Sequence, residues 1–147
     1  MMDNPVQIEQ RTPPRDPALV NEAKSKPGGW VYEIDRPYPA DQQVPPEAIR
    51  GGWEVSADGR LTGKYARNRR YRPVQRSSRP LKPYMHAAAK TNRDQWIVEI
   101  DPRGEKLFPE IPPALMRGWW YVDKTGKITE EFRPNSLWEP AADQVSQ

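Results

Sequence analysis

The feature that most constrains this chain is an internal repeat. The segment Trp30–Asp35 (WVYEID) matches Trp96–Asp101 (WIVEID). Further matches follow at nearly the same offset: Pro45 with Pro112, Gly51 with Gly118, Trp53 with Trp120, Gly59 with Gly126, and Asn68 with Asn135. Because glycines, apolar residues and aromatic residues align together at one period, the sequence predicts two copies of a single small unit.

Each copy is predicted to contain one short helix followed by about three antiparallel strands. Asp16 and Pro17 suit the N-cap and first turn of a helix that Pro27 and the following glycines end, and a second helix is expected over 83–92. The alternation in 30–34 indicates a half-buried strand, and we expect Trp30, Tyr32 and Ile34 of the first copy, like Trp96 of the second, to face inward.

A hairpin is expected after the second strand of each copy. Ser56–Gly59 and Asp123–Gly126 both end in a glycine, which tolerates the positive φ that a tight hairpin turn requires. Trp53 and its counterpart Trp120 lie in the strand before this turn, on the face expected to be buried.

The fold class expected is α+β, a tandem duplication packed as one pseudo-two-fold domain. One copy has about 50 residues and the chain has no cysteine, so a single copy lies near the lower limit for independent folding. The predicted boundaries are a disordered tail over 1–15, repeat 1 over 16–73, a basic linker over 74–82, repeat 2 over 83–140, and a disordered tail over 141–147.

Composition excludes several function classes. Without cysteine there are no disulfides, thiolate metal sites or thiol nucleophiles, and the single histidine, His86, rules out a multi-histidine metal site. No apolar run approaches the ~20 residues that cross a bilayer, and the first residues lack a signal-peptide pattern. We therefore expect a cytoplasmic protein with no metal, no cofactor and no catalytic residues.

Two pairs of carboxylates offer the only pattern with catalytic or Mg²⁺-binding potential. Glu33 and Asp35, like Glu99 and Asp101, lie two residues apart on a predicted strand. No third ligand or base is near them in the sequence, which favours a solvated strand face with an aspartate that starts a turn. An enzyme is therefore the least favoured of three hypotheses.

The segment Lys64–Lys82 concentrates positive charge. It holds eight of the 23 Lys and Arg residues and no acid, although the net charge of the whole chain is only +3. Such a run with interspersed tyrosines suits either an acidic protein partner or nucleic acid, and a solvated strand end with a linker is the simpler alternative. The candidate partner-binding cations are Arg67, Arg69, Arg70 and Arg72.

Two further tryptophans are candidates for partner contact. Trp119 stands where the first copy has Gly52, and because it neighbours Trp120 in a strand, its side chain must point to the other face. Trp138 lies near the end of the second copy. Exposed tryptophans often dominate the binding energy of protein interfaces.

The first copy resembles the small module of the actinobacterial type VII secretion system-associated proteins. The resemblance is carried by Pro27–Asp35, Val44–Trp53, Asp58–Leu61, Asn68 and Tyr71–Pro73. It covers about residues 17–73, with a degenerate echo over 83–140. It implies an accessory or interaction role near secretion or toxin genes and no particular reaction.

Together these observations favour a non-enzymatic protein–protein interaction module, an accessory, adaptor or immunity-type protein linked to secretion or toxin systems. A nucleic-acid-binding protein that uses Lys64–Lys82 is the alternative. The oligomeric state stays open.

Overall fold

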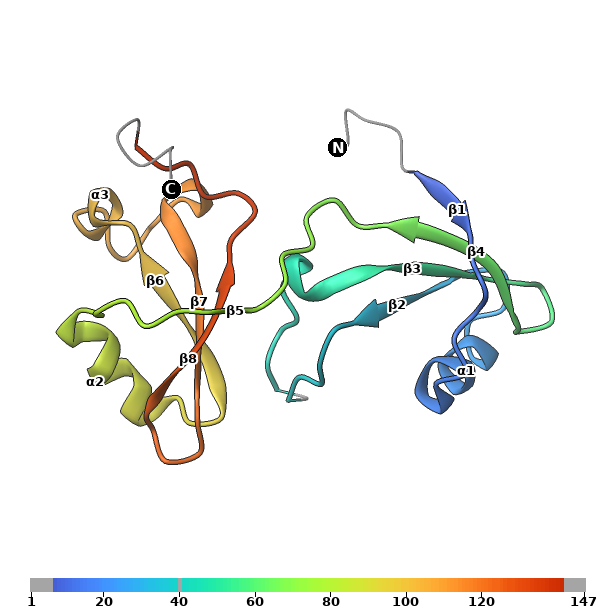
Figure 1. The fold of residues 1–147 in the computed structure, drawn as a ribbon, viewed down its shortest axis with the longest axis horizontal. Helices are drawn as coiled ribbons and strands as arrows, with labels where there is room; N and C mark the ends of the chain where they lie inside the picture. The colour runs from blue at the N-terminus through green and yellow to red at the C-terminus, as the bar shows by residue number, and fades with distance from the viewer. Residues whose placement is uncertain (1–6, 40, 142–147) are drawn as a thin grey trace. The chain divides into compact units, whose positions relative to one another are not determined.

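The computed structural model describes residues 7–39 and 41–141 and divides into two compact units, Met1–Tyr71 and Arg72–Gln147. Each unit is a four-stranded antiparallel sheet with a helix near it (Figure 1). The strand orders are β1-β4-β3-β2 and β5-β8-β7-β6, so the two sheets have the same topology. The α+β class and the duplication are confirmed, and the packing of the copies into one domain stays a prediction.

The first unit contains one strand more than expected. Its elements are β1 (Ile8–Gln10), α1 (Pro17–Lys24), β2 (Trp30–Ile34), a 3₁₀ turn (Pro46–Ala48), β3 (Ile49–Val55) and β4 (Leu61–Arg67). Strand β1 lies in the tail predicted to be disordered, and that prediction is wrong for these residues; 1–6 lie outside the described residues. Three residues are too few to show the two-residue alternation of a strand in the sequence. Their backbone nevertheless pairs with β4, which would otherwise be an open edge of the sheet.

The second unit repeats this plan with an additional helix. Its elements are β5 (Gln75–Arg76), α2 (Pro83–Thr91), β6 (Gln95–Ile100), α3 (Pro102–Glu105), a 3₁₀ turn (Pro113–Leu115), β7 (Met116–Val122) and β8 (Ile128–Pro134). Strand β5 falls inside the predicted linker 74–82, where it occupies the place that β1 has in the first sheet. Of the predicted C-terminal tail, only residue 141 is described. Within the described residues, no helix is long and apolar enough to cross a membrane.

The local start and stop signals of the sequence are confirmed. The Asp16 carboxylate accepts a hydrogen bond from the Ala18 amide at 3.1 Å, which caps α1 as expected. Both hairpin turns use a glycine in the left-handed region, with φ of +83° at Gly59 and +88° at Gly126.

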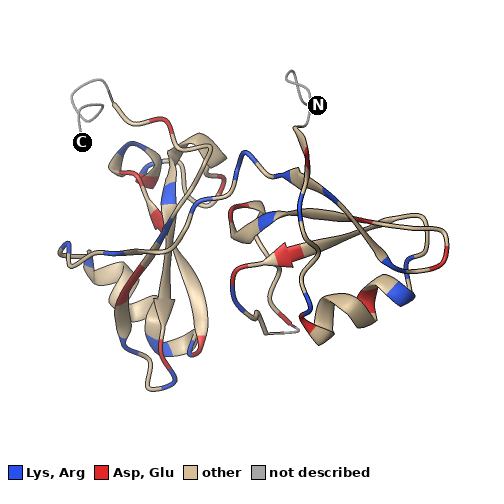
Figure 2. Cartoon of the chain, turned by 45° about the vertical axis from the view of Figure 1, so that its right-hand side comes forward, with Lys and Arg blue, Asp and Glu red and all other residues tan. Residues whose placement is uncertain are grey.

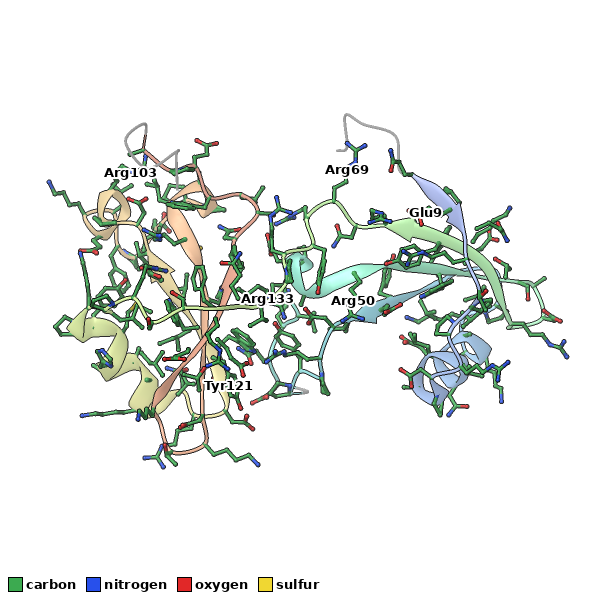
Figure 3. All side chains as sticks on the ribbon, viewed as in Figure 1. Glu9, Arg50, Arg69, Arg103, Tyr121 and Arg133 are labelled. Atoms are coloured by element: carbon green, nitrogen blue, oxygen red, sulfur yellow. The ribbon has the colours of Figure 1, made fainter. Side chains whose placement is uncertain are left out.

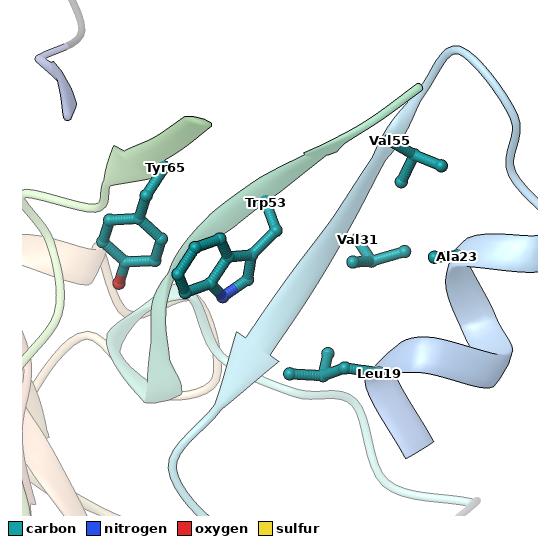
Figure 4. Close-up of a cluster of buried hydrophobic side chains, with 6 residues drawn as sticks. All are labelled: Leu19, Ala23, Val31, Trp53, Val55 and Tyr65. Carbon is teal, nitrogen blue, oxygen red and sulfur yellow. The ribbon is translucent and has the colours of Figure 1, made fainter. Parts of the chain in front are cut away.

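Each unit has its own hydrophobic core between the helix and one face of the sheet. Figure 4 shows the first cluster, which consists of Leu19, Ala23, Val31, Trp53, Val55 and Tyr65. The second consists of Met85, Ala89, Ile97, Trp120, Val122 and Phe132. The rings of Trp53 and Tyr65 lie 4.7 Å apart, and those of Trp120 and Phe132 lie 4.9 Å apart. The two core tryptophans are therefore buried by side chains of their own copy.

The predicted facing of the first long strand is wrong in both copies. Val31 is fully buried against α1, whereas Tyr32 is 55% exposed and Trp30 is half-buried. In the second unit Ile97 enters the core, and Trp96 is half-buried. We call the side of each sheet that faces away from its helix the open face. The more aromatic face of β2 lies on this open face.

Candidate interaction surface

The carboxylates of Glu33 and Glu99 serve as structural acceptors. Glu33 accepts hydrogen bonds from the Trp53 indole at 2.9 Å and from Arg50 at 3.2 Å. Glu99 accepts one from the Trp120 indole at 2.8 Å and two from Arg79, both at 2.8 Å. Burial opposes ionisation of Glu99, but the bonds from Arg79 and Trp120 outweigh it and hold its pKa below the ordinary value.

Asp35 and Asp101, which lie two residues after these glutamates, bind aromatic side chains near the end of each copy. The Tyr71 hydroxyl donates to Asp35 at 3.0 Å, and the Trp138 indole donates to Asp101 at 2.9 Å. Side-chain hydrogen bonds from Arg103 hold the pKa of Asp101 far below its usual range. The expectation of a solvated strand face is therefore wrong, because these acids accept hydrogen bonds from side chains of their own unit. Asp101 does start a turn as expected: it caps α3 by accepting a hydrogen bond from the Arg103 amide at 2.9 Å. Within the described residues, no three His, Cys, Asp or Glu side chains gather as metal ligands.

Most cations of the basic segment Lys64–Lys82 are matched by acids. The ion pairs are Arg67–Glu9 at 2.8 Å, Arg70–Glu47 at 3.1 Å, Arg76–Glu130 at 2.7 Å, Arg79–Glu99 at 2.8 Å and Lys82–Glu105 at 2.6 Å. Figure 2 shows acidic and basic residues interspersed over the elements of each unit. The hydrogen bond from Arg67 holds the pKa of Glu9 below its ordinary value. A run that is strongly basic in sequence thus carries much less net charge in the fold.

The residues predicted to bind a partner are divided between the units. Arg67, Arg69 and Arg70 belong to the first, and the other three, Arg72, Trp119 and Trp138, belong to the second. Arg69 is exposed (Figure 3), whereas Arg72 is half-buried and its carbonyl oxygen accepts a hydrogen bond from Arg133.

The two tryptophans of this set are half-buried in the second unit. Trp138 donates to Asp101, and the Arg117 guanidinium lies 4.5 Å from the centre of its ring. Trp119 lies on the open face of its sheet, as predicted. Neither is an isolated exposed anchor.

A groove on the open face of the first sheet is the best candidate for a functional site. It has a volume of ≈ 460 Å³ and a mainly apolar lining. The lining residues are Ile8, Trp30, Tyr32, Pro46, Ile49, Gly51, Gly52, Ala66 and Asn68. No residue of the predicted partner-binding set is among them.

The strand register explains why the groove exists. Ile8 pairs with Ala66, Ala66 with Gly52, and Gly52 with Tyr32, so these four residues form one row across all four strands. The two central residues are small and the two at the ends are large, which leaves a trough above Gly52 and Ala66. Ile8 and Tyr32 form its walls and are 53% and 55% exposed.

The same row in the second sheet is filled by its own side chains. There Val98 pairs with Trp119, and Trp119 pairs with Arg133. The Arg133 guanidinium lies 5.5 Å from the ring of Trp96 (Figure 3). An indole and a guanidinium thus stand where the first copy has glycine and alanine. The sequence alone shows that Gly52 of the first copy aligns with Trp119 of the second. Only the pairing register of the strands reveals that the glycine leaves a groove.

No protein-family model, no curated protein and no solved structure matches this chain. Its function is therefore inferred from its own residues.

Proposed function

We propose that this chain is a non-enzymatic protein–protein interaction module that binds a bulky apolar side chain of its partner in the groove of the N-terminal unit. The observation that carries this proposal is the row Ile8–Ala66–Gly52–Tyr32, which leaves the open face of the first sheet hollow and apolar. Contiguous exposed apolar surface of this kind is typical of interaction sites.

The lining of the groove suits an aromatic or large aliphatic anchor. Trp30 and Tyr32 present ring faces and edges, and the rest of the lining is largely aliphatic or backbone. Buried aromatic and aliphatic anchors dominate the energy of many interfaces because they remove the most apolar area from water. The filled second copy supports this assignment, since the same sheet position there holds the indole of Trp119.

The resemblance to type VII secretion-associated proteins adds an expected setting. It favours an accessory, adaptor or immunity-type role near secretion or toxin systems, in the cytoplasm. The groove proposal does not depend on that resemblance, because it uses only the residues that line the site.

The nucleic-acid alternative has one observation in its favour, the run of cations over Lys64–Lys82. Five of these eight cations form ion pairs with acids of the described residues, which lowers the charge available for phosphates. Binding through phosphates weakens steeply with salt, whereas binding of an apolar anchor does not. Salt dependence therefore separates the two functions.

The test is selection from a library of displayed peptides on the intact chain, followed by affinity measurements on Gly52→Trp. This variant places in the first copy the residue that the second copy carries. A Cβ at position 52 would lie 3.3 Å from Tyr32 and 3.4 Å from Trp30, so these two side chains must shift by a few tenths of an ångström to admit that atom, and the indole beyond it is expected to fill the groove. The matched control is Val20→Trp, which adds the same indole on α1, at the opposite face of the sheet.

We expect the selected peptides to share an aromatic or large aliphatic residue, and their binding to persist in about 0.5 M salt. The affinity of these peptides should fall by about tenfold or more in Gly52→Trp and should be unchanged in Val20→Trp. If the peptides bind Gly52→Trp as well as the wild type, or if selection yields none, the proposal is wrong. Binding only to single-stranded DNA, lost as salt rises and unaffected by Gly52→Trp, would favour the alternative.

A further inference from the structure

Strand β2 is the outermost strand of the first sheet, and one side of its backbone is unpaired (Figure 1). Just after the strand, the Asp35 amide donates toward β3, to the Ala48 carbonyl at 3.1 Å. Because the backbone groups of successive residues in a strand point to opposite sides, those of Trp30, Tyr32 and Ile34 point away from β3. Within residues 7–39 and 41–141, no group forms a hydrogen bond with them.

The second copy closes the matching edge with a side chain. There the Ile100 amide, which corresponds to that of Ile34, donates a hydrogen bond to the Tyr84 hydroxyl at 3.1 Å. Tyr84 is the second residue of α2, as Ala18 is of α1, and each follows a proline. The first copy thus has a methyl group where the second has the phenol that caps the edge.

A cleft of ≈ 420 Å³ runs along the unpaired edge of β2, between this strand and α1. Its lining includes Ala18 and Leu19 of the helix together with Tyr32 and Ile34 of the strand. Tyr32 and Ile34 are exposed on the open face, whereas Leu19 packs on the helix side. The cleft therefore spans the edge itself, where the unpaired backbone groups lie.

We propose that the edge of β2 binds an extended segment of a partner protein, which adds to the four-stranded sheet as a further strand and lies in the cleft beside α1. A row of outward N–H and C=O groups at the spacing of a strand is matched by another extended backbone. Every second residue of that segment lies beside the exposed side chains of Tyr32 and Ile34, so we expect apolar residues at alternate positions. This site goes beyond the proposed function and does not rest on it.

Charge does not select this occupant. Glu22 pairs with Lys26 and Glu33 with Arg50, each at 3.2 Å, so two of the four carboxylates in the lining are matched, and Arg36 adds a cation. Recognition therefore depends on backbone hydrogen bonds, and binding should persist in about 0.5 M salt.

A lone segment fits this edge better than the β2 strand of a second copy. Val31 of β2 packs against α1, so an antiparallel second β2 would bring its own α1 to the same side of the joined sheet. The first α1 already forms the wall of the cleft on that side. A partner segment without a helix of its own avoids this crowding.

The test is selection of linear peptides from a displayed library on the intact chain, with counter-selection on Ala18→Tyr. Ala18 is exposed, so a tyrosine there leaves the core intact and places at the first edge the phenol that the second copy carries. The matched control is Val20→Tyr, which adds the same side chain on α1 outside the lining of the cleft. Amide spectra check that both variants are folded.

We expect the surviving peptides to bind Val20→Tyr as tightly as the wild type, and Ala18→Tyr at least about tenfold more weakly. Methylation of the peptide amide nitrogens, one at a time, should reduce the affinity at every second position, because only alternate amides face β2. In the complex, the amides of Tyr32 and Ile34 should exchange their hydrogens more slowly than in the free chain.

A selection that yields no such peptides, or a methylation series without alternation, would overturn the inference. So would a wild type that dimerises by itself and becomes monomeric in Ala18→Tyr, because the occupant is then a second copy. The proposed function is judged separately: peptides bound in the groove lose affinity in Gly52→Trp and keep it in Ala18→Tyr. Either inference can therefore fail alone.

Discussion

The substitution Glu99→Gln tests the energetic role of the second-copy carboxylate. Gln keeps the shape of Glu, and one oxygen can still accept the Trp120 indole. The same oxygen can also accept one Arg79 nitrogen, although without the charge of a carboxylate. The amide NH2 group, however, faces the other Arg79 nitrogen, which donates at 2.8 Å to Glu99, so one charge-assisted hydrogen bond is lost and two donors oppose one another.

The expected magnitude follows from the burial of this pair. Breaking a fully buried ion pair costs on the order of 3–5 kcal/mol. The side chains of Glu99 and Arg79 are 13% and 34% exposed, so solvent screens part of the interaction. We therefore expect the free energy of unfolding of the second unit to fall by about 1–2 kcal/mol. The matched variant Glu33→Gln loses one bond at 3.2 Å to Arg50, which is 50% exposed, and should cost less than about 1 kcal/mol.

The pH dependence of this effect has a definite sign. The pKa of Glu99 is lowered in the folded chain, so its stabilisation is present above the ordinary value of 4.5 and is lost as the pH falls through the lowered pKa. Wild type and Glu99→Gln should therefore differ most near neutral pH and converge in acid.

Urea unfolding followed by the amide resonances of β7 and β3 measures the two units separately, because each has its own core. Equal losses for Glu99→Gln and Glu33→Gln, or a difference that persists in acid, would refute this reasoning.

Three further outcomes are expected. Asn135→Ala removes an amide that donates to the Pro113 and Met116 carbonyls at 2.9 and 2.8 Å, and should lower the free energy of unfolding by about 2 kcal/mol in denaturant titrations. The hydrogen bond to Asp94 raises the pKa of Tyr121 to about 12, so ultraviolet titration should find a tyrosine that ionises near this pH and is absent in Tyr121→Phe. The stabilisation from that tyrosine is present below its ordinary pKa of 10.0 and is lost as the pH rises toward 12. Gly52→Ala should raise the free energy of unfolding by about 0.5 kcal/mol, measured in urea, while narrowing the groove.

The parts of the fold that local chemistry decides could be predicted from the sequence. The cap at Asp16, the hairpin glycines and the burial of Trp53 and Trp120 each depend on a residue and its near neighbours. The duplication itself gave a second, independent view of each element.

Partners that lie far apart in the sequence decided the rest. The number of apolar residues on each face of β2 predicts that Trp30 and Tyr32 point inward. The opposite face points inward because Glu33 accepts a hydrogen bond from the indole of Trp53, and this partner, twenty residues later, cannot be recognised from the local sequence. Strand β1 cannot be recognised in the sequence, because only the pairing of its three residues with β4 makes them a strand. The apolar pattern of β2 was a correct signal, but it marks the open face and not the core.

The two neighbouring glycines of β3, Gly51 and Gly52, differ in whether the stability of the fold explains their presence. A Cβ at Gly51 would lie 2.4 Å from the Tyr65 hydroxyl, so packing in the core requires glycine there. At Gly52 the nearest atoms are 3.3 Å away on the exposed Tyr32 ring, no positive φ is involved, and the second copy carries tryptophan at the matching position. Glycine inside a strand costs about 0.5–1 kcal/mol relative to alanine. Folding therefore accounts for Gly51 but not for Gly52, and a glycine at position 52 is what the proposed binding of an apolar side chain in the groove requires.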